Sequence, residues 1–300
     1  MVEPQQLTEN VYYFNSYPSC GMVLTPAGVV AVDGPMRPSQ AYQWRDFIRG
    51  KGTLKYQVVC EHHQDHVASG WFLEPEAIIT SEVTAAEFGK SLVSREAALE
   101  TFAEYDPGFE TAYPEVSAGY EIRRPDFVYR ERLSFALGGR RFVLFMAPGH
   151  TRGNTVVHAV DDRVAFVADL FGLAFHSSDV WSWLRTLGTL EALDVDWYVV
   201  GHGTPVRRDH INEVRAHLLA TIERARDARK AGLTREEFVR DGAATVLGKR
   251  DRRDAEYPER MAKRRGMLQE RGLGTLYDYL DEHPSGAVRP HEDESFPILF

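Results

Sequence analysis

The sequence predicts an α/β sandwich followed by a helical C-terminal region. Short β-rich runs alternate with helical stretches through about residue 208, which indicates the α/β class. Several of these apolar runs end in a Gly-marked turn that carries a His or an Asp, a placement typical of sites built at strand ends. Residues 209–283 contain many Arg, Glu and Ala residues, which favours helices.

The N-terminal elements follow one another in a regular order. Residues 8–36 are expected to form a β-meander, because three short apolar runs are separated by turns that contain Pro or Gly. Residues 39–50 have the apolar spacing of an amphipathic helix, and the apolar run at 56–60 predicts a buried strand. A further strand is expected at 78–81, followed by helix over 82–105.

The middle of the chain contains one segment without a clear period. Residues 106–125 carry several aromatic and Pro residues, and they favour either a lid over a site or a packed surface Ω-loop. Strand and helix signals then return. Strands are expected at 141–145, 155–159, 164–167 and 197–200, with helices at 180–193, 209–231 and 234–283. The sequence therefore predicts an α/β domain over 1–208, a helical extension packed on it over 209–283, and a tail over 284–300 with an apolar end that docks.

Composition and charge restrict the classes of function. The chain has 300 residues, 43% of them hydrophobic and 26% charged, which predicts a globular protein with ample core. A net charge of −9 argues against nucleic-acid binding, which needs a basic face. Two cysteines fit a reduced compartment, and the polar N-terminus has no signal-peptide pattern. We therefore expect a cytoplasmic protein without a membrane partner, and exposed aromatic residues in the helical region favour a homodimer.

The stretch Glu61-His62-His63-Gln64-Asp65-His66 is the densest group of metal-binding side chains in the sequence. It directly follows the predicted strand at 56–60, so that a tight loop can direct several ligands to one point. Imidazole and carboxylate groups together are typical of sites for zinc, iron or manganese. The motif predicts metal chemistry.

Three more residues stand in the same setting, each just after an apolar strand and beside a Gly-marked turn. They are His150 in Pro148-Gly149-His150-Thr151, Asp169 after the run 164–168, and His202 in Gly201-His202-Gly203. Strand ends in an α/β sandwich gather at one edge, so these side chains are expected to converge on the first motif. A Gly beside a ligand allows the sharp turn that this approach requires.

These four motifs, in this order, resemble those of the metallo-β-lactamase-fold superfamily over about residues 8–205. The family pattern is His-x-His-x-Asp-His, then a His in a Pro-Gly-His-Thr loop, an Asp after a strand, and a His in a Gly-His-Gly turn. The resemblance implies a four-layer αβ/βα sandwich with a dinuclear metal centre. It implies a first metal at Glu61, His63 and His150, and a second at Asp65, His66 and His202. Asp169 would bridge the two ions, opposite a water or hydroxide.

Glu61 departs from the family pattern, which has His at this position. A Glu side chain has nearly the same reach, so Glu61 can still ligate, but it removes one positive charge from the centre. A less positive centre is a weaker Lewis acid. Three carboxylates also favour iron or manganese more than a His-rich set does. Zinc is the first expectation from the resemblance, with iron or manganese as alternatives.

Three further residues are predicted to contact the substrate. Arg152 and Asn154 follow the His150 loop, and His176 follows the Asp169 loop. The intervening positions of the first motif, His62 and Gln64, are expected to point away from the ions.

The leading functional hypothesis is metal-dependent hydrolysis. A hydroxide at the dinuclear centre would attack a small-molecule ester, thioester, lactone or amide, and Asp65 would orient it and transfer a proton. A diiron oxygenase or oxidoreductase is an alternative, favoured by the carboxylate-rich ligand set. A non-catalytic metal-binding protein is a second alternative.

Overall fold

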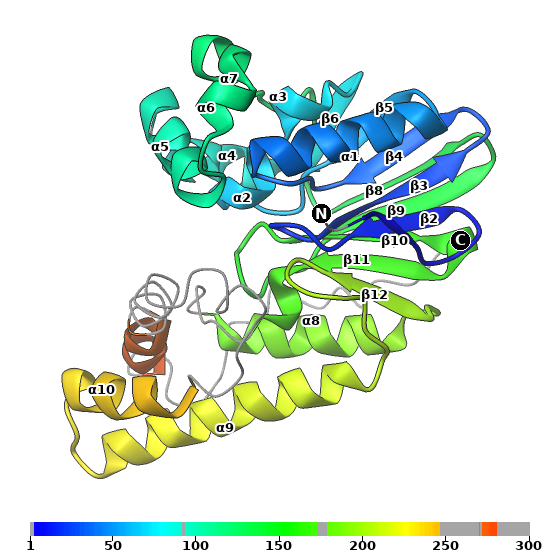
Figure 1. Cartoon of the computed structure of the whole chain (residues 1–300). Helices are drawn as coiled ribbons and strands as arrows, with labels where there is room; N and C mark the ends of the chain where they lie inside the picture. Colours follow the sequence, from blue (N-terminus) through cyan, green and yellow to red (C-terminus); the bar gives the residue numbers. More distant parts are fainter. Residues whose placement is uncertain (1–2, 92–93, 173–178, 247–269, 271, 281–300) are drawn as a thin grey trace. The chain divides into compact units, whose positions relative to one another are not determined.

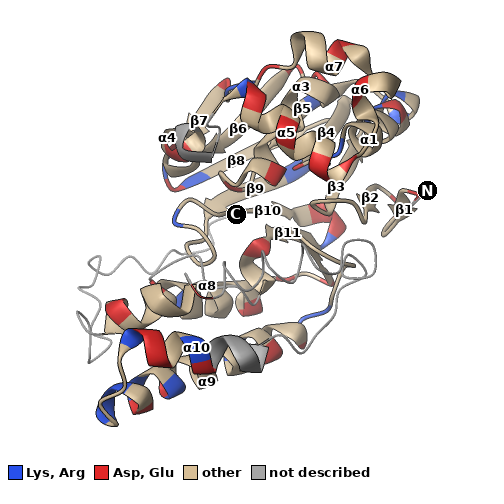
Figure 2. Cartoon of the chain, turned by 60° about the vertical axis from the view of Figure 1, so that its left-hand side comes forward, with Lys and Arg blue, Asp and Glu red and all other residues tan. Residues whose placement is uncertain are grey.

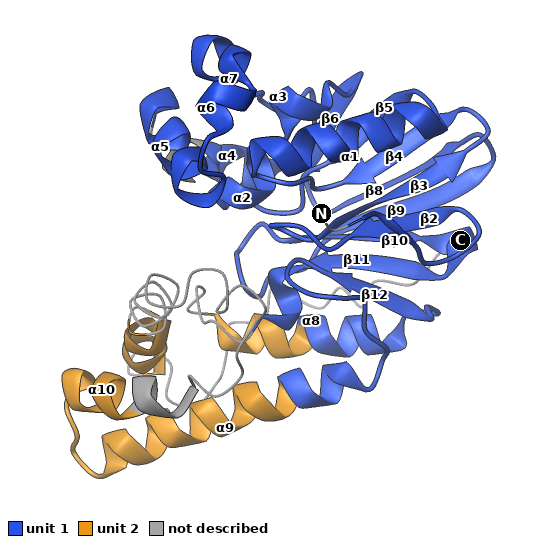
Figure 3. Ribbon diagram, viewed as in Figure 1, with its two compact units in different colours: residues 1–172, 186–214 blue, residues 173–185, 215–300 orange. Residues whose placement is uncertain are grey.

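A computed structural model describes residues 3–91, 94–172, 179–246, 270 and 272–280 (Figure 1). These residues divide into two compact units, which are coloured separately in Figure 3. The first unit comprises residues 1–172 and 186–214, and the second comprises 173–185 and 215–300. No helix among the described residues is both long enough and apolar enough to cross a membrane.

The first unit contains two β-sheets. The larger sheet has, among the described residues, the strand order β1 (Gln5–Gln6), β2 (Val11–Phe14), β3 (Cys20–Thr25), β4 (Gly28–Val32), β5 (Leu54–Val58), β6 (Ala77–Ser81) and β7 (Phe127–Tyr129). The smaller sheet has the order β12 (Trp197–Val200), β11 (Val164–Ala168), β10 (Thr155–Ala159), β9 (Arg140–Met146) and β8 (Arg132–Leu137). The first four strands of the larger sheet are antiparallel, and β4 to β7 are parallel.

Helices connect and cover these strands. The α-helices are α1 (Pro38–Lys51), α2 (Gln64–Val67), α3 (Gly70–Leu73), α4 (Glu82–Ser91), α5 (Arg95–Tyr105), α6 (Phe109–Ala112), α7 (Pro114–Gly119), α8 (Val180–Ala192), α9 (His210–Lys230) and α10 (Arg235–Val246). Two 3-10 turns, η1 (Val160–Asp162) and η2 (Asp169–Phe171), follow β10 and β11. The long helix α1 begins with Pro38, which has a suitable φ for the first turn, and ends before Gly52.

The central strands of the larger sheet, such as β4 and β6, bury both of their faces. Along β4, Val30 and Val32 belong to the core between the two sheets, whereas Val29 and Ala31 pack with Trp44 of α1. This alternation follows from the two-residue period of a strand. On the other side, the hydroxyl of Tyr198 in β12 donates to the carbonyl of Leu190 in α8. Figure 1 shows the resulting order of α1, sheet, sheet and α8, which confirms the predicted four-layer sandwich.

Several predicted turns have the backbone geometry that the sequence requires. Gly138 and Gly139 both have positive φ, at 54° and 84°, and they join β8 to β9. This is the conformation of the tightest hairpin turns, which Gly adopts without steric strain. The strands β7 and β8 that precede the turn were not predicted. In β8, half-buried residues alternate with exposed ones.

Two predictions for the segment after β6 require correction. The continuous helix expected over 82–105 is interrupted, because the side chain of Ser94 accepts a hydrogen bond from the backbone of Ala97 and starts α5 as a new helix. The segment 106–125 contains α6 and α7, and its Tyr120 is fully buried. The hydroxyl of Tyr120 donates to the carbonyl of Ala68. These contacts favour the packed-surface alternative over a lid.

The second unit is helical. Leu273, Leu276 and Leu280 of the helical residues 272–280 are buried, and the Tyr277 hydroxyl donates to the carbonyl of Leu233. Figure 2 shows basic and acidic residues interspersed along α9 and α10, as expected of solvated helix faces. The predicted packing of the helical extension on the α/β domain stays a prediction. The tail over 284–300 lies outside the described residues.

Candidate metal centre

The strand directions explain why distant parts of the chain meet at one edge. Strand β10 is antiparallel to both β9 and β11, and β11 is parallel to β12, so β9, β11 and β12 run in one direction. Their carboxyl ends therefore lie at the same edge of the smaller sheet. The loops that follow these ends carry His150, Asp169 and His202. The first motif follows the carboxyl end of β5 in the other sheet. The structure brings all seven predicted ligands together there, and the ligand roles themselves stay predictions.

The first motif is positioned by a tight turn into α2. Glu61 stands three residues after the end of β5, and Asp65 and His66 lie within the single turn of α2. The backbone amide of His66 donates to the carbonyl of His63, which closes the turn. His62 lies with Nδ1 3.4 Å from Oε2 of Glu87 and belongs to none of the ligand groups of the described residues.

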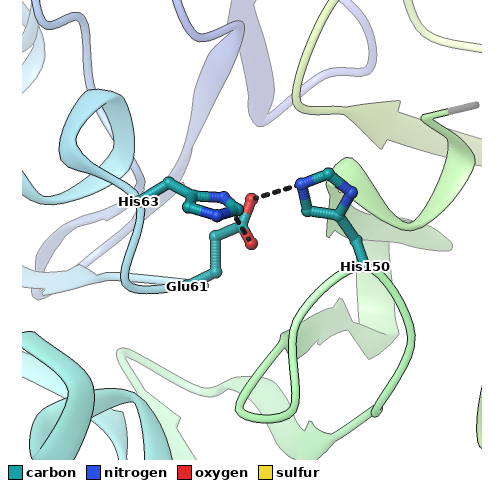
Figure 4. A group of neighbouring side chains, drawn as sticks. All are labelled: Glu61, His63 and His150. Carbon is teal, nitrogen blue, oxygen red and sulfur yellow. Dashed lines mark ion pairs between the residues drawn. The ribbon is translucent and has the colours of Figure 1, made fainter. Parts of the chain in front are cut away.

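The first predicted metal position is formed by Glu61, His63 and His150. Figure 4 shows the Glu61 carboxylate between the two imidazoles. Glu61 Oε2 lies 3.3 Å from Nδ1 of His63, and Glu61 Oε1 lies 4.0 Å from Nε2 of His150. Glu61 is completely buried, so this carboxylate faces the cluster and not solvent.

The second predicted position is formed by Asp65, His66 and His202. Asp65 Oδ2 is 3.4 Å from Nε2 of His202 and 4.0 Å from Nε2 of His66. Asp169 lies between the two positions, because its Oδ2 is 3.5 Å from Nε2 of His150 and 3.2 Å from Nε2 of His202. This placement agrees with the bridging role that the resemblance implies for Asp169.

The donor atoms fit divalent metal ions. In each of three groups, one ligand atom per residue lies within 4.8 Å of the others: Glu61 with His63 and His150; Asp65 with His66 and His202; Glu61 with His66 and Asp169. Both carboxylate oxygens of Glu61, Nε2 of His66 and Oδ1 of Asp169 are buried and make no hydrogen bond of good geometry. Buried polar atoms of this kind are costly unless a ligand satisfies them, and a cation would do so.

The charges in the cluster keep the carboxylates ionised. Burial alone would raise the pKa of Glu61, but the three neighbouring imidazoles, His150 foremost, hold that pKa at about 2. Burial would likewise lower the pKa of His66, but the carboxylates of Asp33 and Glu61 raise it well above its ordinary value. His66 must be neutral to ligate, so loading of the site is expected to release a proton.

Asp33 is a residue of the site that the sequence motifs did not predict. Asp33 follows β4 with φ of 53°, and its Oδ1 accepts the backbone amide of Cys60. Its Oδ2 accepts Nδ1–H of His66 at 2.9 Å, which leaves Nε2 of His66 directed to the cluster. Such a carboxylate orients a ligating imidazole and raises its basicity. An Asp at a strand end before Gly34 was the signal that could have identified it.

Two residues from the N-terminal meander hold the His202 loop. The hydroxyl of Ser19 donates to the carbonyl of Gly203, and the amide of Ser19 donates to the carbonyl of Gly201. The ring of Tyr17 packs on the imidazole of His202 with centroids 5.0 Å apart. No local pattern in the sequence signals these contacts, because they join residues more than 180 positions apart.

A cavity of about 250 Å³ opens beside the second predicted position. It is lined by Ala168, Asp169, Phe171, Gly172, Val200, Gly201, His202, Thr204, Val206 and His210. Apolar walls with a few polar groups are the usual composition of a small-molecule pocket. The cavity therefore lies where a substrate could reach Asp169 and His202.

The structure describes two of the three residues predicted to contact the substrate, and these two differ in burial. Arg152 is exposed and lines a second, open cavity with Glu82 and Glu87. Asn154 is fully buried, and its amide nitrogen lies within hydrogen-bonding distance of the carbonyls of Thr155 and Val167, at 3.3 and 3.5 Å. His176 lies outside the described residues. Their roles toward a substrate stay predictions.

Comparisons with known proteins agree with this architecture. Residues 57–202 match the family model of the metallo-beta-lactamase superfamily. The chain is 25% identical over 221 residues to the 2,4-dinitroanisole O-demethylase subunit alpha of Nocardioides sp. strain JS1661. That match covers 71% of this chain and 60% of the relative, so the chain spans about three-fifths of the relative's length.

Two solved structures share the fold. A metallo-beta-lactamase from Pontibacter korlensis has a TM-score of 0.55 and 17% identity, over 73% of this chain and 99% of that one. The stereoselective inverting sec-alkylsulfatase Pisa1 from Pseudomonas sp. has a TM-score of 0.66 and 15% identity, over 99% of this chain and 52% of that one. At these identities the likeness concerns the fold alone.

Proposed function

The domain that contains residues 57–202 belongs to the metallo-β-lactamase superfamily, and on that premise we propose that the chain is a metal-dependent hydrolase of a small molecule. The observation that carries the proposal is the convergence of two trios of predicted ligands, with Asp169 between them, at one sheet edge. Glu61, His63 and His150 would hold one divalent ion, and Asp65, His66 and His202 the second. Two such ions would supply a Lewis acid and a bound water of lowered pKa.

The residues of the chain supply orientation and proton transfer. Burial would raise the pKa of Asp65, but the imidazoles of His202 and His66 hold it well below its usual range. Asp65 is therefore an ionised carboxylate at neutral pH that can orient the reacting water by accepting its hydrogen bond. Because a carboxylate of low pKa is a weak base, Asp65 would hold a proton only transiently. Its side chain is 15% exposed, which keeps it accessible from the solvent side of the cluster.

The cavity beside Asp169 and His202 would hold the substrate. With a volume of about 250 Å³, it suits a small molecule. Ala168, Phe171 and Val206 provide apolar walls, and Thr204 and His210 provide polar groups. An apolar substrate with one polar or ionic group at the bond to be cleaved matches this lining.

A substrate panel with metal reconstitution tests the proposal. It should contain thioesters, lactones, carboxylic esters, amides and phosphoesters. The names of the relatives add an activated aryl methyl ether and a secondary alkyl sulfate. We expect turnover of at least one class, loss of turnover on chelation, and recovery with zinc, iron or manganese. Absence of turnover across the panel, with two ions bound per chain, would contradict hydrolysis.

A redox function is the second candidate, favoured by one observation. The buried carboxylate of Glu61 brings the number of acidic ligands to three, and such sets suit iron. Metal analysis of the full chain, purified without added metal, separates the two candidates. Two irons with a visible oxo-bridge absorption would support redox chemistry, whereas two zinc ions per chain would exclude the diiron proposal.

A further inference from the structure

We propose that Glu61 bridges the two metal positions together with Asp169, so that the chain takes up its two ions as a coupled pair. The sequence predicts Glu61 only as a terminal ligand of the first ion. The new assignment rests on the proposed dinuclear centre but not on the reaction proposed for it.

The two oxygens of Glu61 face imidazoles of different trios. Oε2 lies 3.3 Å from Nδ1 of His63, which belongs to the first trio. Oε1 lies 3.2 Å from Nε2 of His66, which belongs to the second. Two ligand atoms on one tetrahedral ion, with bonds of about 2.0–2.1 Å, lie about 3.3 Å apart. Each Glu61 oxygen therefore has the spacing of a fellow ligand, but toward a different ion.

Asp169 also approaches both trios, although its Oδ2 lies nearer to His202 of the second trio, at 3.2 Å, than to His150 of the first. Its Oδ1 lies 3.5 Å from Nε2 of His66, and its Oδ2 lies 3.5 Å from Nε2 of His150. Glu61, His66 and Asp169 also form a ligand group of their own within 4.8 Å. The two carboxylates thus link the first trio to the second at two separate points.

The chemistry of the Glu61 side chain supports a bridging ligand, and not a terminal ligand of one ion such as His would be. A neutral imidazole offers one lone pair to one ion, whereas a carboxylate offers two oxygens. Glu61 is completely buried, and neither oxygen makes a hydrogen bond of good geometry. If Glu61 ligated one ion through one oxygen, its other oxygen would remain buried without a partner. Chelation of one ion by both oxygens would not account for the approach of Oε1 to His66 of the second trio. A bridge satisfies both oxygens.

A bridge makes the two binding events interdependent. With one ion bound, an oxygen of Glu61 and an oxygen of Asp169 remain directed at the other position. The first ion repels the second, but the second ion enters a site whose negative groups are already held in place and where a buried oxygen of Glu61 still makes no hydrogen bond of good geometry. We therefore expect positive cooperativity, with few molecules that hold a single ion.

Manganese titration of the full chain tests this directly. The chain is stripped with a chelator and loaded with one equivalent of Mn²⁺ per chain, and electron paramagnetic resonance distinguishes exchange-coupled pairs from isolated ions. The wild type is expected to give the pair signal from about half of the molecules. Glu61→His, which restores the family pattern, should give isolated ions at one equivalent and pairs only near two.

Glu61→Ala supplies a second readout. A bridge predicts that this change weakens both positions, including the one formed by the intact trio of Asp65, His66 and His202. The expected loss at that position is about 10-fold to 100-fold in affinity by calorimetry. His62→Ala is the matched control from the same loop, and it should bind two ions as the wild type does. Circular dichroism confirms that each variant is folded.

The outcomes distinguish a bridging role of Glu61 from the existence of the dinuclear centre. If Glu61→Ala loses one ion and holds the other with unchanged affinity, Glu61 is a terminal ligand and the bridge is wrong, while the dinuclear centre stands. Isolated Mn²⁺ at one equivalent in the wild type would also overturn the bridge. If the wild type binds no metal, both the bridge and the proposed function fail.

Discussion

At the scale of single residues, the site depends on positions that leave no room for other side chains. A Cβ on Gly201 would lie 2.0 Å from Oδ1 of Asp169, closer than any two such atoms can approach. The amide of Gly201 also donates to the carbonyl of Ala168, which has φ of 47°. Gly201 thus allows β12 to approach the turn that presents Asp169.

Gly201→Ala is therefore expected to displace the Asp169 carboxylate and to weaken metal binding. A misplacement of about 1 Å can cost about 100-fold in activity, and we expect a loss of that order. Metal content after dialysis and kcat on the best substrate measure it. Gly50→Ala in α1 is the control, since nothing lies within 4 Å of its added Cβ. A Gly201→Ala protein with two tightly held ions would show that the loop relaxes freely.

At the scale of elements, the central strand of the smaller sheet contains a buried histidine. His158 in β10 pairs across the sheet with Ala165 of β11 and Val143 of β9, and it is 7% exposed. Burial lowers the pKa of His158 to about 4 and outweighs the opposing effect of Asp194. The neutral imidazole is therefore the form that the fold requires.

Stability should fall between pH 6.5 and 4 because of His158. The unfolded chain binds this proton near pH 6.5, whereas the folded chain binds it only near pH 4, so acid favours unfolding. The full contribution, on the order of 3 kcal/mol, is present above pH 6.5 and is lost as the pH falls toward 4. Urea denaturation at pH 7, 6 and 5 measures the effect. Relative to the wild type, His158→Gln should lose less stability over this range, and parallel pH curves would contradict the assignment.

Strand and helix positions were predictable where a single local signal dominates. The runs of β3, β4, β11 and β12 are apolar and bounded by turns, and each was expected. The strand β8 alternates exposed with half-buried residues, and it was missed because the other strands were identified from continuous apolar runs, which β8 lacks. The segment with α6 and α7 was missed as helix because each of these helices spans only one or two turns, and their stability comes from packing of residues such as Tyr120.

At the scale of the whole molecule, the predicted metal centre would join the two sheets of the first unit. The loop after β5 belongs to one sheet, and the loops after β9, β11 and β12 belong to the other. The unfolded chain has no preformed site, so bound ions stabilise the folded state. The ions are thus expected to link the carboxyl edges of the two sheets.

Removal of the ions should therefore lower the thermal stability of the chain. At a free-metal concentration of 1,000 times Kd, binding contributes about 4 kcal/mol, which corresponds to a decrease in Tm on the order of 10 °C when a chelator is added. Circular dichroism melting with and without chelator measures it. Asp169→Ala is the control, because its Tm should respond much less to the chelator. An equal Tm of the wild type with and without chelator would argue against this link between the sheets.

The order of the motifs, and the sheet edge at which they were expected to meet, can be read from the sequence alone. Each predicted ligand follows an apolar strand and stands in or beside a short turn, and such signals are local, so no long-range information is needed to read them. The resemblance to a known family then implied how the predicted ligands divide between two metal positions.

The arrangement of the side chains around those positions follows from the fold and not from the motifs. The approach of Glu61 to His66, the hydrogen bond from His66 to Asp33 and the contact of Gly201 with Asp169 depend on how strands pack within and between the sheets. Differences of about an ångström distinguish a terminal ligand from a bridge, and spacing along a chain does not encode them. For this reason Glu61 was predicted as a ligand from the sequence, whereas the proposal that it bridges the two positions arises only from the fold.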